Sequence, residues 1–359
     1  MLFRSTTSSL RGILIAFAAA LPFTLSLSAP PAQAQQKAAK YLFGAKKLPA
    51  HIRAQTHGFY NKGCLAGGVA LPIDGPTWQA MRLSRNRRWG HPDMIELVVE
   101  LSKRAKKDGW NGLLVGDISQ PRGGPMLSGH ASHQVGLDTD IWLRPMPNKR
   151  FTRAQRESVS AISMLKKGTV RVDDRIWTRQ HEAVLRNAAQ FPATQRIFVH
   201  PGIKKKLCDT VRGDRRWLQK VRPYWGHHYH FHIRITCRPG SPGCKAQAPV
   251  GRGDGCDASL DWWFKVAFAP KKKVKKKKTA KKKKPVKVKR KRLARLSDLP
   301  QACRTVLNAN APTTLAQVTF NSAAYAPGAA TTAAARAISS NLEESIEGTI
   351  PLPKRRPAR

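Results

Sequence analysis

The spacing of apolar residues predicts two helices and two buried strands in the middle of the chain. From Pro92 to Lys107, apolar residues recur at the spacing of one helix face, at Ile95, Val98, Val99 and Leu101. Pro92 suits the first turn of this helix, and Gly109 lies just beyond its end. A buried strand is predicted over Leu113–Ile118, a second helix over Arg179–Gln190, and a further strand over Arg196–Val199. This order favours an α+β fold over a regular alternation of strands and helices.

Two further segments show the two-residue period of half-buried strands, with polar groups of chemical interest on one face. In Leu137–Leu143, one face carries the apolar positions and Thr139, while the other carries Asp138, Asp140 and Trp142. In the segment 225–235, one face carries Phe231, Ile233 and Ile235, and the opposite face carries His230, His232 and Arg234. Each predicted strand therefore has an apolar back and a front with potential metal ligands.

These polar faces predict a catalytic metal site. His130 and His133 lie in a Gly-flanked turn just before the first strand, close enough to converge with Asp140. Three His and Asp ligands with a fourth position left to water are typical of catalytic zinc. Adventitious metal binding or packing of lone histidines would not explain why these residues fall in phase with an apolar strand face. Asp138 would either hold a ligand histidine in one tautomer or cap the turn.

The N-terminal residues are typical of a secretory signal peptide. Arg4 and Arg11 precede an apolar stretch, and Ala32-Gln33-Ala34 follows it, so residues 1–34 are predicted to be removed after Ala34. All six cysteines lie beyond that point, and an even number in an exported chain indicates three disulfides among 15 possible pairings. Turn-forming residues between Cys237 and Cys244 favour that one pair. A structural zinc site is the alternative, but the chain has no C-x-x-C pair.

Charge is concentrated in one segment. The chain has 65 Lys and Arg residues against 21 acidic ones, a net charge of +44, and 16 of those basic residues lie in 271–292. This insertion is predicted to be disordered, followed by a return segment, 293–310, with Cys303, and a disordered tail, 311–359. The composition excludes collagen-like and wholly disordered chains, and no apolar run after the signal reaches the ~20 residues of a membrane helix.

The motif His130-x-x-His133-x6-Asp140 with a later His230-x-His232 resembles the penicillin-insensitive murein endopeptidases, zinc peptidases related to lysostaphin and the D-Ala-D-Ala metallocarboxypeptidases. The resemblance covers about 64–268, including Gly116-Asp117, and resumes at Cys303. It implies a zinc endopeptidase domain over 35–270 with a small antiparallel sheet that carries the zinc site, flanked by helices and stapled by disulfides. Its implied ligands are His133, Asp140 and His232, with His130 adjacent and a possible further ligand.

The same resemblance implies that His230 is a catalytic imidazole, which acts as a base on the metal-bound water or stabilises the oxyanion, and that His227 is a second catalytic histidine. It implies a periplasmic enzyme that hydrolyses the D-alanyl–meso-diaminopimelyl cross-link of peptidoglycan. It also implies the disulfides Cys64–Cys303, Cys208–Cys256 and Cys237–Cys244.

Other functions fit parts of the sequence. A zinc D-Ala-D-Ala carboxypeptidase would use the same ligands on a different bond. The basic block Lys271–Arg292 would suit a protein that binds polyanions; with an export signal, an anionic envelope polymer or membrane surface is a better partner than nucleic acid. Ser163-x-x-Lys166 matches a motif of penicillin-binding enzymes, but the motifs that accompany it there are absent from the chain.

Overall fold

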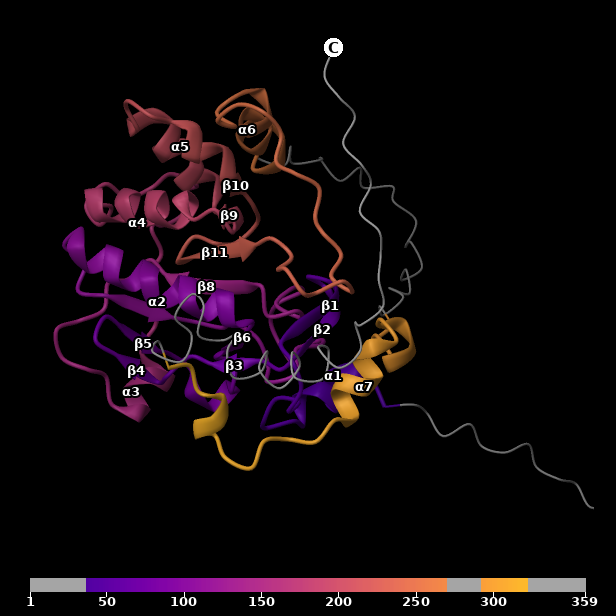
Figure 1. Cartoon of the computed structure of the whole chain (residues 1–359). Coiled ribbons are helices and arrows are strands. Elements are labelled where there is room, and N and C mark those ends of the chain that lie inside the picture. The colour runs from indigo at the N-terminus through magenta and orange to yellow at the C-terminus, as the bar shows by residue number, and fades with distance from the viewer. Residues whose placement is uncertain (1–36, 270–291, 322–359) are drawn as a thin grey trace, which may run out of the picture. The chain divides into compact units, whose positions relative to one another are not determined.

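The computed structural model describes residues 37–269 and 292–321 (Figure 1). Seven strands form the main sheet, in the order β10 (Val221–Pro223), β9 (Thr194–Val199), β11 (His230–Ile235), β8 (Asp138–Trp142), β7 (Leu113–Val115), β5 (Trp78–Ala80) and β4 (Asp74–Gly75). Two separate pairs are β1 (Gln55–Phe59) with β2 (Lys62–Ala66), and β3 (Val69–Ala70) with β6 (Trp89–Gly90). The helices are α1 (Ala39–Gly44), α2 (Pro92–Lys107), α3 (Arg153–Ser158), α4 (Arg179–Gln190), α5 (Pro201–Thr210), α6 (Ala258–Trp262) and α7 (Ala302–Asn308).

The α+β class is confirmed, but the main sheet is larger than the expected antiparallel one and is mixed. β5 pairs in parallel with β7, and β9 pairs in parallel with β10. Each parallel pair is joined by a crossover helix, α2 in the first case and α5 in the second, as parallel pairing requires. The central pairs β8–β7, β8–β11 and β11–β9 are antiparallel, so the expected arrangement holds for the strands that carry the polar faces.

The helix predictions from the apolar spacing are confirmed, with α2 and α4 at the predicted bounds. The His91 side chain caps α2 by accepting a hydrogen bond from the Asp93 N–H at 3.3 Å, and Gly109 follows the helix with a φ of 85°, which favours glycine. The strand β7 ends at Val115, shorter than predicted, and β9 begins earlier, at Thr194. After Val115 the chain stays hydrogen-bonded to Asp140 of β8, through the Gly116 N–H at 2.8 Å and the Asp117 carbonyl at 3.0 Å, which keeps Asp117 beside the candidate site.

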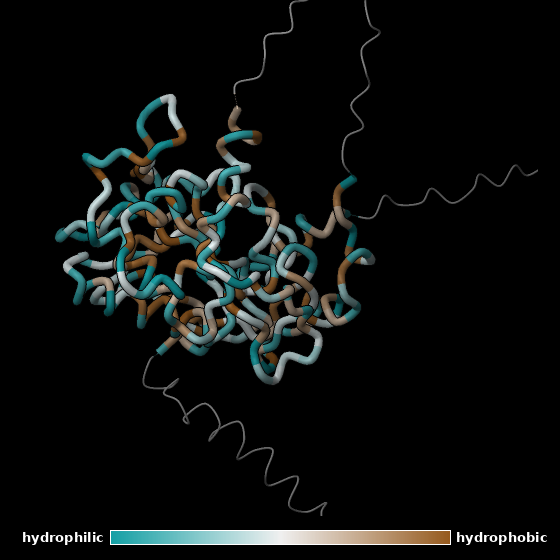
Figure 2. Tube along the Cα trace, turned by 90° about the horizontal axis from the view of Figure 1, so that it is seen from above, coloured by the Kyte–Doolittle hydropathy of each residue, from teal (hydrophilic) through white to brown (hydrophobic). Residues whose placement is uncertain are grey.

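The apolar backs of β8 and β11 share one core with α2 and α4. Phe231 and Ile233 of β11 are fully buried in the same cluster as Ile95 and Val98 of α2 and Leu185 of α4. α2 and α4 also contact each other (Figure 1), and apolar segments gather inside the described domain (Figure 2). The helices therefore cover one face of these strands and leave the histidine-bearing face free for chemistry.

The three disulfides that the family resemblance implied are all present: Cys64–Cys303, Cys208–Cys256 and Cys237–Cys244. The first ties α7 of the return segment to β2. Arg122 reinforces this connection because its buried Nη1 donates to the carbonyls of Val306 (2.8 Å) and Leu307 (2.9 Å) at the end of α7.

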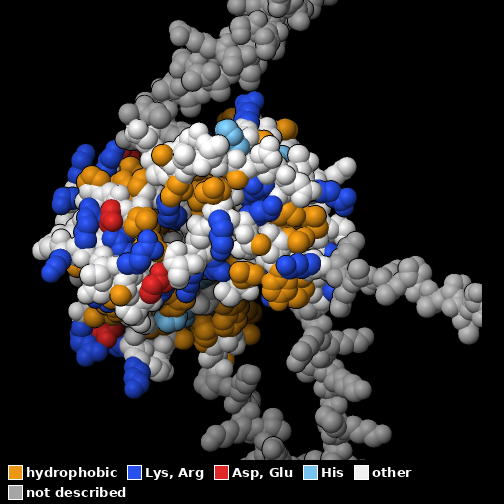
Figure 3. All heavy atoms as spheres, turned by 90° about the horizontal axis from the view of Figure 1, so that it is seen from below, with side chains coloured by type: hydrophobic (Ala, Val, Ile, Leu, Met, Phe, Trp, Pro, Cys, Tyr) orange, Lys and Arg blue, Asp and Glu red, His pale blue; other side chains and the backbone are white. Residues whose placement is uncertain are grey.

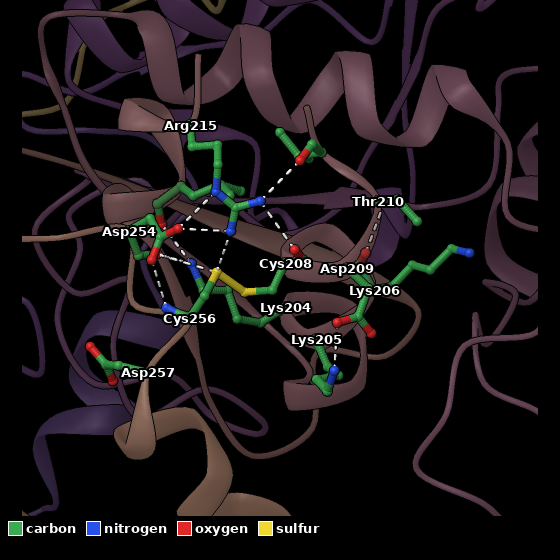
Figure 4. Close-up of a disulfide and its surroundings, with 12 residues drawn as sticks. Lys204, Lys205, Lys206, Cys208, Asp209, Thr210, Arg215, Asp254, Cys256 and Asp257 are labelled. Carbon is green, nitrogen blue, oxygen red and sulfur yellow. Dashed lines mark hydrogen bonds and ion pairs between the residues drawn. A yellow bond between two sulfur atoms is a disulfide. The ribbon is translucent and has the colours of Figure 1, made fainter. Parts of the chain in front are cut away.

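The disulfide Cys208–Cys256 joins α5 to the segment before α6 (Figure 4). Beside it, Arg215 Nε donates to Asp254 Oδ2 at 2.9 Å, and Arg215 Nη1 donates to the Cys208 carbonyl at 3.1 Å. The covalent bond and the ion pair together fix the loop that leads to α6.

The expected tail and insertion fall partly inside the described residues. Phe320 is buried in the main core, and its N–H donates to the Ala70 carbonyl at 2.8 Å. The signal peptide, nearly all of the basic insertion and residues 322–359 lie outside the described residues. Within the described ranges, no helix has the length and apolar character that crossing a membrane requires. Lys and Arg side chains are spread over the face shown in Figure 3, where Asp and Glu are few.

Candidate active site

The register of β8 against β11 places the polar groups opposite one another. His232 pairs with Asp140, Arg234 with Asp138, and His230 with Trp142. Because side chains alternate along a strand, His232 and Asp140 lie on the same face of the sheet, away from Phe231 and the helices. The predicted in-phase faces are thus joined into one polar surface.

Asp140 lies at the centre of four imidazoles. Its carboxylate is 3.5 Å from His130 Nδ1, 3.4 Å from His133 Nε2, 3.6 Å from His230 Nε2 and 3.4 Å from His232 Nδ1. The ligand atoms of His130, His133 and Asp140 all lie within 4.8 Å of one another. The structure therefore brings together the residues in which the sequence predicts metal ligands.

Three of these imidazoles have their far nitrogen held by a hydrogen-bond acceptor. His133 Nδ1 lies 2.7 Å from the Ile118 carbonyl, His232 Nε2 lies 2.9 Å from Asp138 Oδ1, and His130 Nε2 lies 3.0 Å from Asp117 Oδ2. These acceptors place a proton on the far nitrogen and a lone pair on the nitrogen that faces Asp140.

Lone pairs on nitrogen thus point at carboxylate oxygens, an arrangement that needs a cation between them. Among the described residues, His133 Nε2 and Asp140 Oδ1 are buried atoms without a hydrogen-bond partner. Buried polar atoms are rarely left unpaired, because each one costs free energy. The donor set of neutral imidazoles and one carboxylate fits a divalent transition metal such as zinc.

The electrostatics support the same interpretation. Burial lowers the pKa of His232 to about 3 and that of His230 to about 4, so both rings are neutral near pH 7. Burial would also lower the pKa of His133, but the Asp140 carboxylate raises it to about 9. The Asp140 carboxylate thus favours a positive charge at His133, and a metal ion would compete with a proton for this position.

Asp138 fulfils both roles that the sequence leaves open. Its Oδ1 faces His232 Nε2, and its Oδ2 accepts the His133 backbone N–H at 3.0 Å, which caps the turn. Arg234 donates to the same carboxylate from Nε at 2.7 Å and from Nη2 at 3.3 Å. Burial alone would raise the pKa of Asp138, but the charge of Arg234 and the His232 hydrogen bond hold it well below its usual range.

His227 lies beside this group rather than in its centre. Its ring centroid is 4.9 Å from that of His230, and its Nδ1 lies 2.7 Å from the Trp225 carbonyl, which leaves Nε2 for the site. His133 and His227 have φ values of 67° and 55°, in the left-handed region that non-glycine residues rarely adopt. Such strain concentrates at functional sites.

His130 also lines two hollows, of about 290 and 340 Å³. The first is further lined by Arg82, Arg85, Trp142, Tyr229 and His230. The second is further lined by Tyr60, Phe198, Tyr224, His227 and His232. A peptide that crosses the His130 ring would find room for side chains in both hollows.

Comparison with known protein families covers every residue of this candidate site. A family model described as penicillin-insensitive murein endopeptidase matches residues 56–308, which include all six candidate site residues. The chain belongs to this family. The protein named penicillin-insensitive murein endopeptidase in Haemophilus influenzae is 46% identical over 213 residues, 59% of this chain and 74% of that protein. Proteins of the same name from Klebsiella pneumoniae and Yersinia enterocolitica are each 40% identical over 212 and 211 residues, 59% of this chain and 77% and 76% of theirs.

Within this murein endopeptidase domain, sequence reasoning gave no role to three residues around the site. Asp117 faces His130, and both Arg85 and Arg87 form ion pairs with Asp117. The sequence marks Asp117 only as part of the Gly116-Asp117 pair covered by the family resemblance. The two arginines lie in an irregular segment where no periodicity marks a face, so no sequence pattern pointed to them.

Proposed function

We propose that this chain is a periplasmic, zinc-dependent murein endopeptidase that hydrolyses the D-alanyl–meso-diaminopimelyl cross-link of peptidoglycan. The observation that carries the proposal is the convergence of oriented imidazole lone pairs on the buried Asp140 carboxylate. Family membership supports murein as the substrate class. Zinc is the metal we infer, since His and Asp ligands with an open position are typical of catalytic zinc.

In this proposal, His133, Asp140 and His232 hold the metal, and His130 lies where it can join them. When bound there, zinc would polarise the scissile carbonyl and make a water more acidic. Asp138 keeps the lone pair of His232 directed inward, and the Ile118 carbonyl does the same for His133. The chain thus preorganises its ligands before the metal arrives.

His230 is the proposed proton acceptor. Its Nε2 lies 3.6 Å from Asp140 Oδ1, and burial keeps the ring neutral near pH 7, so it can accept a proton from the attacking water. The same proton can then pass to the amine that leaves when the amide bond breaks. His227, whose ring is next to that of His230 and whose Nε2 carries a lone pair, is placed to share this proton.

Digestion of purified cross-linked muropeptide dimers, with mass analysis of the products, tests the function. Zinc-loaded protein is expected to release monomers, while chelator-treated protein and the variant His133→Ala should release none. His51→Ala is the control, because His51 is exposed and lies outside the site. Loss of a single terminal D-Ala would identify a carboxypeptidase instead, and intact dimers would contradict both functions.

The periplasmic location rests on residues 1–34, whose sequence is typical of a signal peptide. N-terminal sequencing of the mature protein from the cell envelope should begin at Gln35. A mature chain that retains Met1 would contradict the location.

The sequence of Lys271–Arg292, with 16 basic and no acidic residues, favours a binding function in addition to the proposed hydrolysis. We propose that this segment attracts anionic envelope polymers or an anionic membrane surface. A deletion of 271–292 should keep muropeptide cleavage but lose salt-sensitive sedimentation with anionic lipid vesicles. Unchanged sedimentation of the deletion variant would contradict this role.

A further inference from the structure

The turn that precedes β6 has an unusual backbone. A short 3-10 helix, Leu83–Arg85, is flanked by Arg82 with a φ of 55° and Asn86 with a φ of 51°. In the described part of the chain, these two and the site residues His133 and His227 make up the non-glycine residues with positive φ. Left-handed backbone at such residues costs about 1–3 kcal/mol each and persists only where the surroundings enforce it.

Contacts from α3 and the residue after it hold this turn in place. The Arg82 guanidinium donates to the carbonyls of Arg156 (3.0 Å), Glu157 and Val159 (2.9 Å). The Glu157 carboxylate accepts from both the N–H and the hydroxyl of Ser84, each at 2.8 Å. These contacts fix the turn through Arg82 and Ser84, and Arg85 takes no part in them.

Arg85 lines the first hollow and is only partly engaged. Its Nη1 lies 3.1 Å from Asp117 Oδ2, which is the one hydrogen bond of this side chain among the described residues, and its side chain is 46% exposed. Its charge also acts on the Glu157 carboxylate. The same Asp117 oxygen also receives Arg87 Nη1 at 2.9 Å and His130 Nε2 at 3.0 Å. Arg85 is therefore separated from a candidate metal ligand by only one shared oxygen atom.

The charges around this oxygen do not balance. Arg85 and Arg87 carry two positive charges against the one negative charge of Asp117, and Arg82, which lines the same hollow, donates its hydrogen bonds to backbone carbonyls. Asp140 also lines this hollow, but its carboxylate faces the imidazoles of the candidate metal site. The hollow thus offers the exposed guanidinium of Arg85 to an anionic group of a ligand.

We propose that Arg85 binds a carboxylate of the substrate, the one on the carbon bonded to the scissile nitrogen. This inference rests on the proposed function and deepens it. In the D-alanyl–meso-diaminopimelyl bond, the amine half carries a carboxylate on that carbon, close to the bond that breaks. A guanidinium with free N–H groups matches a planar carboxylate in geometry and charge. Arg85 would thereby recognise the leaving half and place the scissile amide beside His130.

A pair of muropeptide dimers tests this proposal. The two substrates differ only in whether that carboxylate is free or is a primary amide. Loss of a charge-assisted hydrogen bond predicts that Arg85→Ala lowers kcat/KM on the free acid by about 10- to 100-fold. On the amide, the same variant should stay within about threefold of the wild type, since no ionic contact is lost. Arg153→Ala, at an exposed arginine at the start of α3, should leave both values unchanged.

An equal loss on both substrates would overturn the proposal, because Arg85 would then act only by positioning Asp117 and His130. No loss on either substrate would overturn it as well. Calorimetric binding of uncleavable analogues, with the scissile amide reduced to an amine linkage, keeps this test separate from the proposed function. If the wild type cleaves neither dimer, the proposed function fails, and equal affinity of wild type and Arg85→Ala for the acid analogue would still overturn the role of Arg85.

Discussion

The substitution Asp138→Asn probes the contacts that orient the candidate ligands. Asp138 is fully buried and accepts four hydrogen bonds, from His232 Nε2, from two atoms of Arg234 and from the His133 N–H. Asparagine has nearly the same shape, but its amide nitrogen would face a donor in either orientation. Arg234, which is only 6% exposed, would also lose its counter-ion.

The expected loss of stability follows from that unpaired charge. Removing one partner of a buried ion pair costs roughly 3–5 kcal/mol. We expect the lower end, about 3 kcal/mol, because the Arg234 guanidinium also lies over the rings of Tyr60 (4.0 Å) and Phe198 (5.1 Å) and donates to Gln247. Loss of the acceptor that fixes the His232 tautomer should weaken zinc binding by about 10- to 100-fold.

Two measurements separate these effects. Urea unfolding of the zinc-free protein gives the stability, and competition with a chelator gives the zinc affinity. The double variant Asp138→Asn with Arg234→Met removes the unpaired cation, so it should recover much of the stability but not the zinc affinity. Asp214→Asn is the control, because Asp214 forms an exposed ion pair with Arg216. Unchanged zinc affinity in Asp138→Asn would refute the positioning role.

Two further predictions concern stability. Contact with the His91 ring, whose Nδ1 lies 3.3 Å from Asp93 Oδ1, together with Arg238, lowers the pKa of Asp93 from 3.8 to about 2. Asp93 therefore stabilises the fold above pH 3.8, and this contribution is lost as the pH falls through about 2. Because Asp93 is partly exposed, we expect Asp93→Asn to lower the free energy of unfolding by only about 1 kcal/mol at pH 5, as measured with urea. This difference from the wild type should shrink toward pH 2, and a difference that stays constant with pH would contradict the prediction. Loop-closure entropy predicts that serines in place of Cys64 and Cys303, which are 239 residues apart, lower the free energy of unfolding by about 5 kcal/mol. For Cys237 and Cys244, which are seven residues apart, the same replacement should cost about 2 kcal/mol, and equal losses in urea unfolding would contradict this reasoning.

The sequence predicts most of what depends on periodicity. The helices α2 and α4 have their predicted bounds, and the alternation in β8 and β11 correctly separates the apolar backs from the histidine-bearing fronts. These predictions succeed because one face of each element must be buried, which forces a regular spacing of apolar residues. The sequence also places His130 and His133 in this site, because they lie in a Gly-flanked turn just before β8.

Features that depend on long-range pairing were not predictable. The parallel pairs β5–β7 and β9–β10 have only three paired positions each, too few for a recognisable pattern. Arg85 and Asp117 are single polar residues outside regular elements, and they meet only because the strained turn and the end of β7 adjoin in space. The left-handed backbone of His133 and His227 also has no local signal, since tertiary contacts rather than glycine enforce it.

The central claim is that His133, Asp140 and His232 bind the catalytic metal ion, and the position of a bound ion tests it most directly. Crystals of protein that cleaves muropeptides, measured at the zinc absorption edge, should show one strong anomalous peak about 2.0–2.2 Å from His133 Nε2, Asp140 and His232 Nδ1. Active protein whose crystals show no peak there, or a peak held by other residues, would contradict the account.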